Sequence, residues 1–413
     1  MQCDSTNIKH WIETLGTFTR EDLPGNTRFS CTPEDLAAKT YLIKEMKALD
    51  LKVTMDHFGN LIGITEGTDP DALPVMVGSH LDTVREGGRF DGIAGVVSGL
   101  EIVRVLKANR KKTRHPVAVI AFAEEEGGRF GSAFLGSRWF TRNLKDEDLA
   151  AYVDAGGMTL PEALKVLEGL NPLVERTHQP VYPARAFFEL HIEQGPVLEN
   201  TGTALGLVDT ITGSSSFEVT LRGEANHAGT TPMDMRKDAF FGMLPIATEL
   251  NRLARAQNIH SVGTIGRLRL VPDAYNIIPG EAIFTMDLRS LDTDTLSSMI
   301  HHMKAFVETT AREAGLGFSL REKHLEWPVH LDKDHLKILK EAASKRHYSY
   351  LQMGSGAGHD AIILSEHCPT SMVFVPSVKG RSHCKEEFTA WEAIEKGCNV
   401  LLDTVAAIAQ IVE

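Results

Sequence analysis

Residue types that bind metal ions follow four apolar segments of this chain. In chain order, residues 74–78 lead to His80, 117–123 lead to Glu124, Glu125 and Glu126, 186–190 lead to His191, and 370–376 lead through a short loop to His383. A fifth candidate, Asp91, stands just before a segment with helical spacing of apolar residues. Imidazole nitrogens and carboxylate oxygens suit zinc, manganese, nickel or cobalt. The residues therefore favour a metal-dependent hydrolase.

These candidates are far apart in the sequence, so the fold must bring them together. Each apolar segment has the length and composition of a buried strand, and apolar residues of 93–107 recur at helical spacing between two such strands. This βαβ pattern predicts a parallel-rich α/β sheet with helices on both faces. In such a sheet the ligand crevice lies outside the carboxyl ends of the strands, where the candidate ligands are found.

Each candidate alone has a simpler explanation. A single His or Asp in a loop is more often structural than a ligand, and consecutive glutamates are also favoured at a helix N-terminus by the helix dipole. Two features favour a functional site. Asp82 follows His80 by two residues, a suitable position for its carboxylate to orient the imidazole by a hydrogen bond. Consecutive carboxylates after a strand point in different directions, so that one can bind metal while its neighbour faces a bound water.

The order of elements changes in the middle of the chain. Residues 1–210 alternate helix and strand. Residues 211–326 follow the βαββαβ order of a ferredoxin-like α+β sandwich, with strands expected at 217–221, 263–271, 282–289 and 317–321 and helices at 239–256 and 294–314. Because His383 lies near the C-terminus and must meet His80, we expect residues 1–210 and 327–413 to form one discontinuous catalytic domain. Residues 211–326 would then be an inserted domain.

Composition and charge exclude several classes of protein. A chain of 413 residues favours two domains, and its net charge of −12 without a compensating basic stripe argues against a nucleic-acid partner. No segment approaches the roughly 18 apolar residues of a membrane span, and residues 1–10 lack the form of a signal peptide. We therefore expect a cytoplasmic protein without a membrane partner. The five cysteines are odd in number and widely spaced, which predicts reduced thiols.

Five sequence blocks together resemble a known family. They are Gly-Ser-His-Leu-Asp-Thr at 78–83, Gly-Gly-Arg-Phe-Asp-Gly at 87–92, Ala-Glu-Glu-Glu-Gly at 123–127, Glu-Leu-His-Ile-Glu-Gln-Gly at 189–195 and Ser-His at 382–383. In this order the chain resembles the M20 metallohydrolases over nearly its whole length. Within them it is most similar to the amidase/hydantoinase/carbamoylase branch, which contains N-carbamoyl-L-amino-acid hydrolases, allantoate amidohydrolases and β-ureidopropionases. The block at 189–195 is specific to this branch.

The resemblance implies two divalent metal ions in each subunit. The implied ligands are Asp91 as a bridge, His80 and His191 at one ion, and Glu126 and His383 at the other. Glu125 would be the general base that takes a proton from a bridging water and returns it to the leaving nitrogen. Asp82 would orient His80.

The resemblance also implies residues that bind the substrate. Arg289 and Asn276 resemble the residues that hold a substrate carboxylate, and the planar fork of Arg suits this partner. Gly356, Ala357 and Gly358 resemble a Gly-rich loop that offers backbone groups to the substrate. The neighbouring His359 is expected to be structural.

His227 resembles a residue that crosses from a partner subunit to stabilise the tetrahedral oxyanion. The alternative from the sequence alone is a turn His that caps the helix expected near residue 237. The resemblance thus implies a homodimer in which His227 acts in trans. It also implies that the inserted domain is a lid and dimerisation domain with hinges near 208–211 and 326–329.

Two departures from the branch bear on the substrate. Cys384-Lys385 follows His383 where the branch usually has Asn/Ser-Pro, and Ser214, Ser215 and Ser216 stand where allantoate amidohydrolases carry a Gln-Arg-Arg-type segment. Without that long amide donor, we expect a substrate with one ureido group. This is an N-carbamoyl-L-amino acid, which would yield the free amino acid, carbon dioxide and ammonia.

Other activities are compatible with the same residues. Allantoate is the main alternative, because residues 354–361 are close to the allantoate type, with Gly358 where carbamoylases often have Ala. β-Ureidopropionase, N-acyl-amino-acid deacylase and dipeptidase activities come next. A scaffold protein that has lost the chemistry is disfavoured, because every implied ligand and Glu125 are present.

Overall fold

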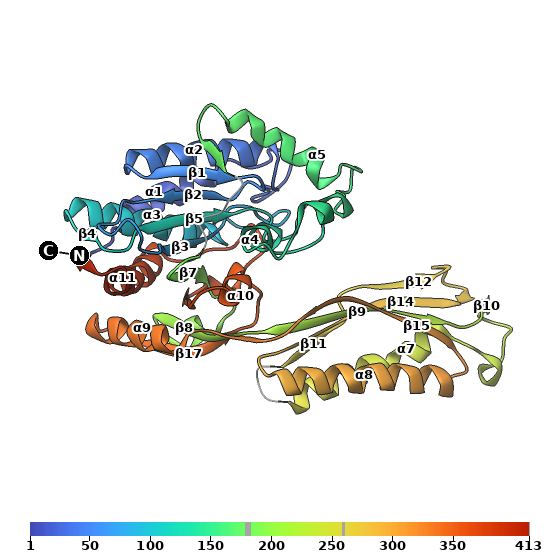
Figure 1. Cartoon of the computed structure of the whole chain (residues 1–413). Coiled ribbons are helices and arrows are strands. Elements are labelled where there is room, and N and C mark those ends of the chain that lie inside the picture. Colours follow the sequence, from blue (N-terminus) through green and yellow to red (C-terminus); the bar gives the residue numbers. More distant parts are fainter. Residues whose placement is uncertain (178–182, 258–260, 413) are drawn as a thin grey trace. The chain divides into compact units, whose positions relative to one another are not determined.

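We describe the protein by a computed structural model, which covers residues 1–177, 183–257 and 261–412 (Figure 1). The chain forms two compact units. Unit 1 comprises Met1–Asp209, Leu331–Met353 and His359–Glu413, and unit 2 comprises Thr210–His330 and Gly354–Gly358. Gly354–Gly358 belongs to the second unit, although the rest of that unit ends at His330.

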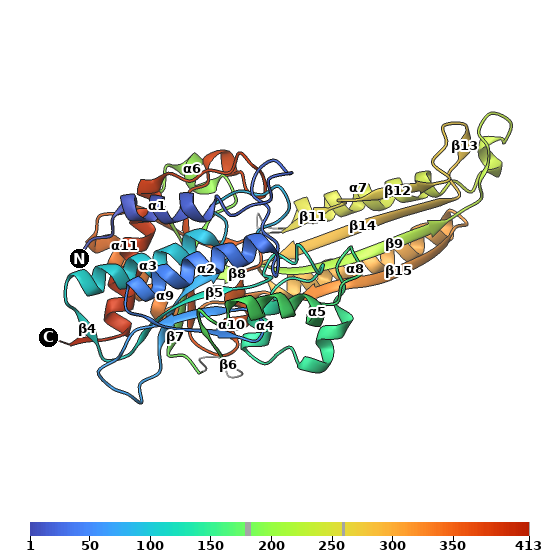
Figure 2. The ribbon, with the colours of Figure 1, turned by 90° about the horizontal axis from the view of Figure 1, so that it is seen from above.

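Unit 1 is built on a mixed sheet (Figures 1 and 2). The strand order is β8 (Leu205–Ile211), β18 (Thr370–Val375), β7 (Ala186–Ile192), β3 (Val75–His80), β5 (Val117–Phe122), β2 (Leu61–Ile64), β1 (Lys52–Asp56) and β6 (Glu175–Thr177), with β17 (Tyr350–Ser355) also pairing with β8. The central strands β18, β7, β3 and β5 are mutually parallel. The predicted parallel-rich α/β sheet is therefore confirmed, with antiparallel strands β8 and β2 on either side of the parallel group.

The four parallel strands are buried on both faces, which explains their continuous apolar sequences. Gly99 of α3 (Ile93–Ala108) leaves room for the Val119 side chain on one face, because a Cβ there would lie 2.9 Å from Val119 Cγ1. On the opposite face, the ring of Phe122 packs against that of Phe140 in α4 (Leu135–Phe140), with 5.7 Å between the ring centroids. Residues three apart on a strand point to opposite faces, so helices cover both sides.

Further helices complete unit 1. Contacts with α3 are made by α1 (Ser5–Leu15) and α11 (Trp391–Ile408), and α9 (Lys333–Lys345) contacts α11. α10 (Asp360–Ser365) contacts both β7 and α4, whereas α2 (Pro33–Ala48) contacts β1 and β2. The short helices α5 (Leu160–Leu164) and α6 (Val197–Thr201) lie in the connections. No helix in the described ranges is both long and apolar enough to span a bilayer.

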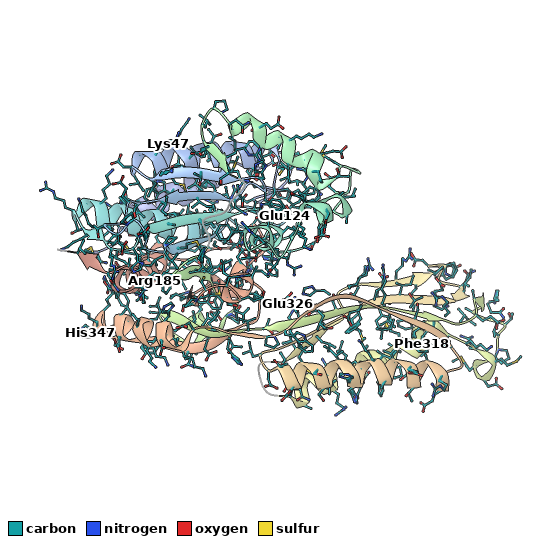
Figure 3. All side chains as sticks on the ribbon, viewed as in Figure 1. Lys47, Glu124, Arg185, Phe318, Glu326 and His347 are labelled. Atoms are coloured by element: carbon teal, nitrogen blue, oxygen red, sulfur yellow. The ribbon has the colours of Figure 1, made fainter. Side chains whose placement is uncertain are left out.

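Unit 2 consists of an antiparallel sheet, two long helices and a short pair of strands, so it has more strands than the expected βαββαβ order. Its antiparallel sheet runs β11 (Val262–Thr264), β14 (Glu281–Ser290), β9 (Gly213–Arg222) and β15 (Gly317–Glu326), with β12 (Leu268–Val271) also paired to β14. Every second side chain of β9 and β14 is buried in the core formed with α7 (Ala239–Ala256) and α8 (Thr293–Glu313). The single strand expected at 263–271 is instead two strands. Figure 3 labels Phe318, one of the exposed residues of β15.

Candidate active site

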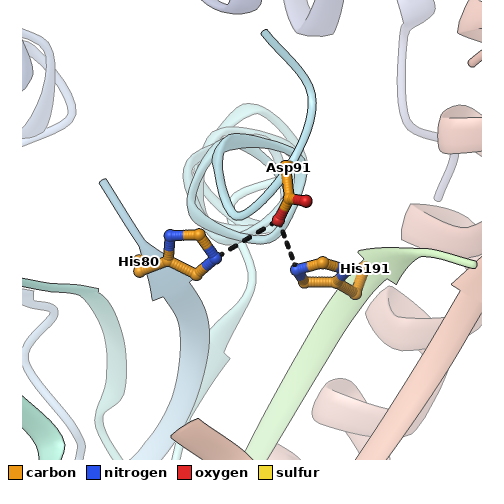
Figure 4. A group of neighbouring side chains, drawn as sticks. All are labelled: His80, Asp91 and His191. Carbon is orange, nitrogen blue, oxygen red and sulfur yellow. Dashed lines mark ion pairs between the residues drawn. The ribbon is translucent and has the colours of Figure 1, made fainter. Parts of the chain in front are cut away.

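His80 and His191 stand at the carboxyl ends of the adjacent parallel strands β3 and β7. The Nδ1 atom of His80 lies 3.0 Å from the backbone oxygen of Asp82, and Nδ1 of His191 lies 2.9 Å from that of Ile192. A carbonyl only accepts hydrogen bonds, so Nδ1 of each ring carries the proton. The Nε2 atoms approach Asp91 Oδ1 at 3.4 and 3.1 Å (Figure 4). Both rings therefore present the atom that a metal ion would bind.

Asp91 is shared by a second group. Its other oxygen, Oδ2, lies 3.3 Å from His383 Nε2, and the same nitrogen lies 3.4 Å from Glu126 Oε1. The structure thus brings all five predicted ligands together, in two groups that have Asp91 in common. His80, Glu125 and Glu126 form a further group that links these two.

The three consecutive glutamates diverge after β5. Glu124, labelled in Figure 3, has a left-handed φ of 55°, and its Oε1 accepts hydrogen bonds from the backbone N–H groups of Arg129 and Phe130. Glu125 Oε2 lies 3.8 Å from His80 Nε2, and Glu126 contacts His383. One carboxylate therefore holds the following loop while the other two face the histidines.

Asp82 acts differently from the prediction. Its backbone oxygen, and not its carboxylate, accepts from the His80 ring, and the carboxylate oxygen Oδ1 stands 4.0 Å from His80 Nδ1. The carboxylate instead accepts hydrogen bonds from the backbone N–H groups of Glu125 and Glu126 at 3.1 and 3.2 Å. The chain direction after His80 turns the carbonyl toward the ring and the side chain toward the glutamates. Asp82 thus positions both the imidazole and the glutamate turn.

The electrostatics of the site favour a bound cation. Burial raises the pKa of Glu125 well above its usual range. Burial opposes protonation of His80, but the nearby Glu125 and Asp91 outweigh it and raise the pKa of the imidazole. Contacts with Asp91 and Glu126 raise the pKa of His383 to about 10. His191 Nε2 is buried and makes no hydrogen bond despite its closeness to Asp91. Nitrogen and oxygen atoms directed at a common point fit a divalent metal ion.

Backbone geometry at the site is also unusual. Gly92 has a φ of +67°, and a Cβ there would lie 2.5 Å from the His80 ring. His383 has φ 56° and Gln194 has φ 58°, in the left-handed region that costs a non-glycine residue energy. Such conformations gather at functional sites because the surrounding structure must hold them in place.

Three residues without a predicted role also contact this group. Gln194 Nε2 donates to Asp91 Oδ2 at 2.6 Å, and Ser382 Oγ donates to the same oxygen at 2.8 Å. Glu387 accepts from the backbone N–H of Asp91 at 3.1 Å. Gln194 and Ser382 lie inside the blocks quoted above, three residues after His191 and directly before His383, which was a usable signal. Glu387 is the second of two consecutive glutamates, four residues after His383, and nothing in the sequence distinguished it from Glu386.

Unit 2 carries the predicted substrate residues. Arg289 Nε donates to Asp287 Oδ1 at 2.8 Å, and its Nη1 donates to the backbone oxygen of Gly356 at 3.1 Å. The turn of Gly356, Ala357 and Gly358 is held by Ser355, whose hydroxyl bonds the backbone of Ala357. Arg289 is therefore fixed beside this loop.

His227 and Asn276 lie together elsewhere in unit 2. The short strand β10 (Asn226–His227) pairs with β13 (Ile277–Ile278), and the Ala228 N–H donates to the backbone oxygen of Asn276. His227 Nδ1 accepts from the N–H groups of Gly229 and Thr230. Its imidazole does not cap α7, because Asp238 does. An accepting Nδ1 requires the proton on Nε2, so the exposed ring offers a hydrogen-bond donor.

β14 separates these residues from Arg289. Asn276 precedes β14 and Arg289 lies at its far end, and ten extended residues span roughly 30 Å. A small substrate cannot contact Arg289 and Asn276 of the same unit 2. The structure therefore does not bring the two predicted carboxylate-binding residues together within one chain.

His359 and the cysteines stand outside the proposed chemistry. The buried His359 ring packs against that of His191, with 4.5 Å between the ring centroids. Burial lowers the pKa of His359 well below its usual range. A neutral, packed imidazole agrees with the structural role expected for it. All five cysteines lie within the described residues and are free thiols, of which only Cys384 is not buried.

Comparison with known proteins identifies the family. The profile of peptidase family M20/M25/M40 matches residues 76–407. The chain belongs to this family. M20 proteins are metal-dependent, in agreement with the groups around Asp91.

Known relatives show which M20 proteins this chain is similar to. It is 40% identical over 98% of both chains to an N-carbamoyl-L-amino-acid amidohydrolase of Paenarthrobacter aurescens. It is 34% identical to an allantoate amidohydrolase of Escherichia coli, over 95% of both chains. A crystal structure of a hydantoinase/carbamoylase family amidase from Burkholderia multivorans matches it with a TM-score of 0.92 and 34% identity, covering 99% of this chain and 98% of the other.

Proposed function

We propose that this chain is a metal-dependent amidohydrolase that cleaves N-carbamoyl-L-amino acids to the free amino acid, carbon dioxide and ammonia. The observation that carries the proposal is the convergence of His80, His191, Glu126 and His383 on Asp91, with Glu125 beside them. The substrate class is supported by relatives named N-carbamoyl-L-amino-acid amidohydrolase at 37 to 40% identity. We further propose two divalent ions in each subunit, of zinc, manganese, cobalt or nickel, in a cytoplasmic enzyme.

The buried carboxyl of Glu125 suits a proton shuttle. When bound, the ions would activate a water molecule and polarise the ureido carbonyl. Glu125 would take a proton from that water and return it to the leaving nitrogen. Burial raises the pKa of this carboxyl, so it holds a proton more readily than an exposed carboxyl. The backbone oxygens at Asp82 and Ile192 would keep the two imidazoles oriented.

Arg289 would bind the carboxylate of the substrate. Its Nε and Nη1 atoms each already donate one hydrogen bond, which fixes the plane of the guanidinium, while further N–H groups stay available. A substrate with a free α-carboxylate therefore fits the site better than an internal peptide bond. The loop of Gly356, Ala357 and Gly358 would line the same region.

The placement of His227 supports a homodimer. Because β14 separates the His227–Asn276 pair from Arg289, both can reach one substrate only if they come from different subunits. The Nε2–H of His227 is a suitable donor for a developing oxyanion. Unit 2 would then be a lid and dimerisation domain, with its chain connections as hinges.

A mixture of two inactive variants tests the trans arrangement. Glu125→Gln and His227→Ala subunits are each expected to be inactive as homodimers. A mixed dimer should regain about one half of wild-type turnover, because one of its two sites receives an intact Glu125 and an intact His227. A random equimolar mixture, in which about half of the dimers are mixed, should regain about one quarter. A fully active monomer, or no recovery in mixed dimers verified by mass, would contradict this role of His227.

Ammonia release from a substrate panel tests the activity. The manganese-loaded enzyme would be compared on N-carbamoyl-L-methionine, its D-enantiomer, N-carbamoyl-β-alanine and allantoate, with amino-acid release followed for N-acetyl-L-methionine. Preference for the L-carbamoyl compound is the expected result. Allantoate is the second candidate, supported by the E. coli relative and by Gly358. If the enzyme prefers allantoate, our proposal would be wrong and allantoate amidohydrolase activity would take its place.

A further inference from the structure

Two loops of unit 1 meet behind Asp91. One loop contains Gly88, Phe90 and Asp91, and the other runs from Ser382 to Phe388. They are nearly 300 residues apart in the chain, as the contact between Asp91 and Glu387 spans 296 positions. Their junction contains a buried carboxylate, Glu387, which is only 4% exposed. Neither the metal ligands nor the substrate residues described above include it.

Glu387 binds both loops. Its Oε1 accepts from the backbone N–H groups of Phe90 and Asp91, at 2.9 and 3.1 Å. Its Oε2 lies 2.9 Å from Ser382 Oγ, which is itself 2.8 Å from Asp91 Oδ2. The single side chain thus touches the backbone of the shared ligand Asp91 and, through Ser382, the loop that carries His383.

The surroundings are built for this contact. A Cβ at Gly88 would lie 2.0 Å from Glu387 Oε1, so only glycine lets the first loop approach so closely. The ring of Phe90 packs edge-on against Phe388, with 5.5 Å between the ring centroids, and at a tilt against Trp391, with 5.1 Å between the centroids. The aromatic residues next to Asp91 and Glu387 therefore hold the loops together from the apolar side. The left-handed φ of 56° at His383 needs such support from its neighbours.

We propose that Glu387 is a positioning residue of the metal centre, which fixes Asp91 and His383 relative to each other. It would not touch substrate. Because Asp91 belongs to both ligand groups, an error in its position weakens both at once. Residues that orient metal ligands typically contribute about 10- to 100-fold to metal affinity. The inference rests on the proposed two-metal function and adds a residue that holds the ligands of that site in position.

The test is a calorimetric titration of the metal-stripped, full-length protein with Mn²⁺ alone. Glu387→Ala should weaken binding of both ions by roughly 10- to 100-fold. Glu387→Gln should stay within about threefold of the wild type, because its amide oxygen still accepts from both N–H groups and its NH₂ donates to Ser382. Rescue by this isosteric variant distinguishes hydrogen-bonded positioning from a simple need for charge. If Glu387→Ala lacks the wild-type circular dichroism spectrum, Glu387→Asp replaces it and should show the same loss through its shorter reach.

Glu101 offers a matched control. It is fully buried in α3 and accepts from a backbone N–H, that of Asp4, but contacts none of the ligands. Glu101→Ala should lower the melting temperature and leave Mn²⁺ affinity unchanged. The role of Glu387 would be overturned if Glu387→Ala bound Mn²⁺ like the wild type, or if Glu101→Ala weakened binding equally. Failure of the wild type to bind Mn²⁺ would instead overturn the metal centre itself.

Discussion

Ser214 of β9 stands directly opposite Arg289 of β14 in the antiparallel register of unit 2. Opposed residues carry their side chains on the same face of the sheet, with Cβ atoms about 5 Å apart. The side chain at position 214 therefore borders the guanidinium that we propose as the carboxylate anchor. Serine leaves space there, whereas a long amide would reach into the region next to Arg289. This makes position 214 a candidate determinant of substrate choice.

Ser214→Gln should shift preference toward allantoate. The added amide can donate to a second ureido group, and the ratio of kcat/KM for allantoate to that for N-carbamoyl-L-methionine should rise by about 10- to 100-fold. Thr220→Gln is the control, since Thr220 is also partly buried and points to the same face of β9 but pairs with Ile283. An equal shift in both variants would contradict a local role for position 214.

Arg289→Lys should raise KM and lower kcat/KM by about tenfold or more for substrates with a free α-carboxylate. Lysine offers a point charge and loses the two hydrogen bonds by which Asp287 and Gly356 fix the plane of the guanidinium. Initial rates at varied substrate concentration give both constants. The amide of the same substrate, which lacks the carboxylate, should be affected much less. Wild-type kinetics would remove Arg289 from the site.

Glu125→Gln should lower kcat by about 10²- to 10⁴-fold, the usual contribution of a general acid–base residue. The amide is nearly isosteric but cannot take the proton of the water. Metal content, measured by elemental analysis, should stay at the wild-type level. Unchanged turnover with intact metal content would show that another group is the base.

Gly92→Ala should disrupt the site through His80. The added methyl group would lie 2.5 Å from the imidazole, and the φ of +67° disfavours a side chain by about 1–3 kcal/mol. Gly157→Ala separates the two causes, because Gly157 also has a positive φ, +86°, but open space around its Cβ position. Both variants should lose thermal stability, and only Gly92→Ala should lose metal affinity. Equal Mn²⁺ affinities would contradict the predicted clash.

Removal of metal by a chelator should abolish ammonia release, and added Mn²⁺, Co²⁺, Ni²⁺ or Zn²⁺ should restore it. Binding should also strengthen as pH rises. The pKa of His383 is raised to about 10 by Asp91 and Glu126, so its imidazole holds a proton at pH 7 that a metal ion must displace. Calorimetry in buffers of different ionisation enthalpy measures this proton release. Affinity that fell between pH 6 and 8 would contradict the sign of this linkage.

Much of the site followed from the sequence because its geometry depends on strand ends. Four buried strands are recognisable from their apolar runs, and parallel neighbours place their carboxyl ends at one edge of the sheet. His80, His191 and the glutamates after β5 therefore had to converge. The two halves of the expected strand 263–271 are separated by Gly266, which helps to explain the break that the apolar pattern did not reveal.

What the sequence did not predict depends on the course of the backbone in loops. Asp82 and Glu387 both act through main-chain N–H groups, and hydrogen bonds to the main chain leave no pattern of residue types. The same holds for Gly354–Gly358, whose assignment to unit 2 depends on contacts with residues such as Arg289 and Thr212. Spacing along the chain carries no information about such contacts.

The chain passes between its two units four times, because Gly354–Gly358 belongs to unit 2. Exchange of residues 211–326 with those of a relative would therefore transfer Arg289 but leave behind the loop whose Gly356 oxygen holds it. A chimera intended to change substrate choice needs both segments from the same parent. The same constraint applies to natural recombination, since exchange at a single pair of breakpoints around residues 211–326 separates Arg289 from the loop that binds it.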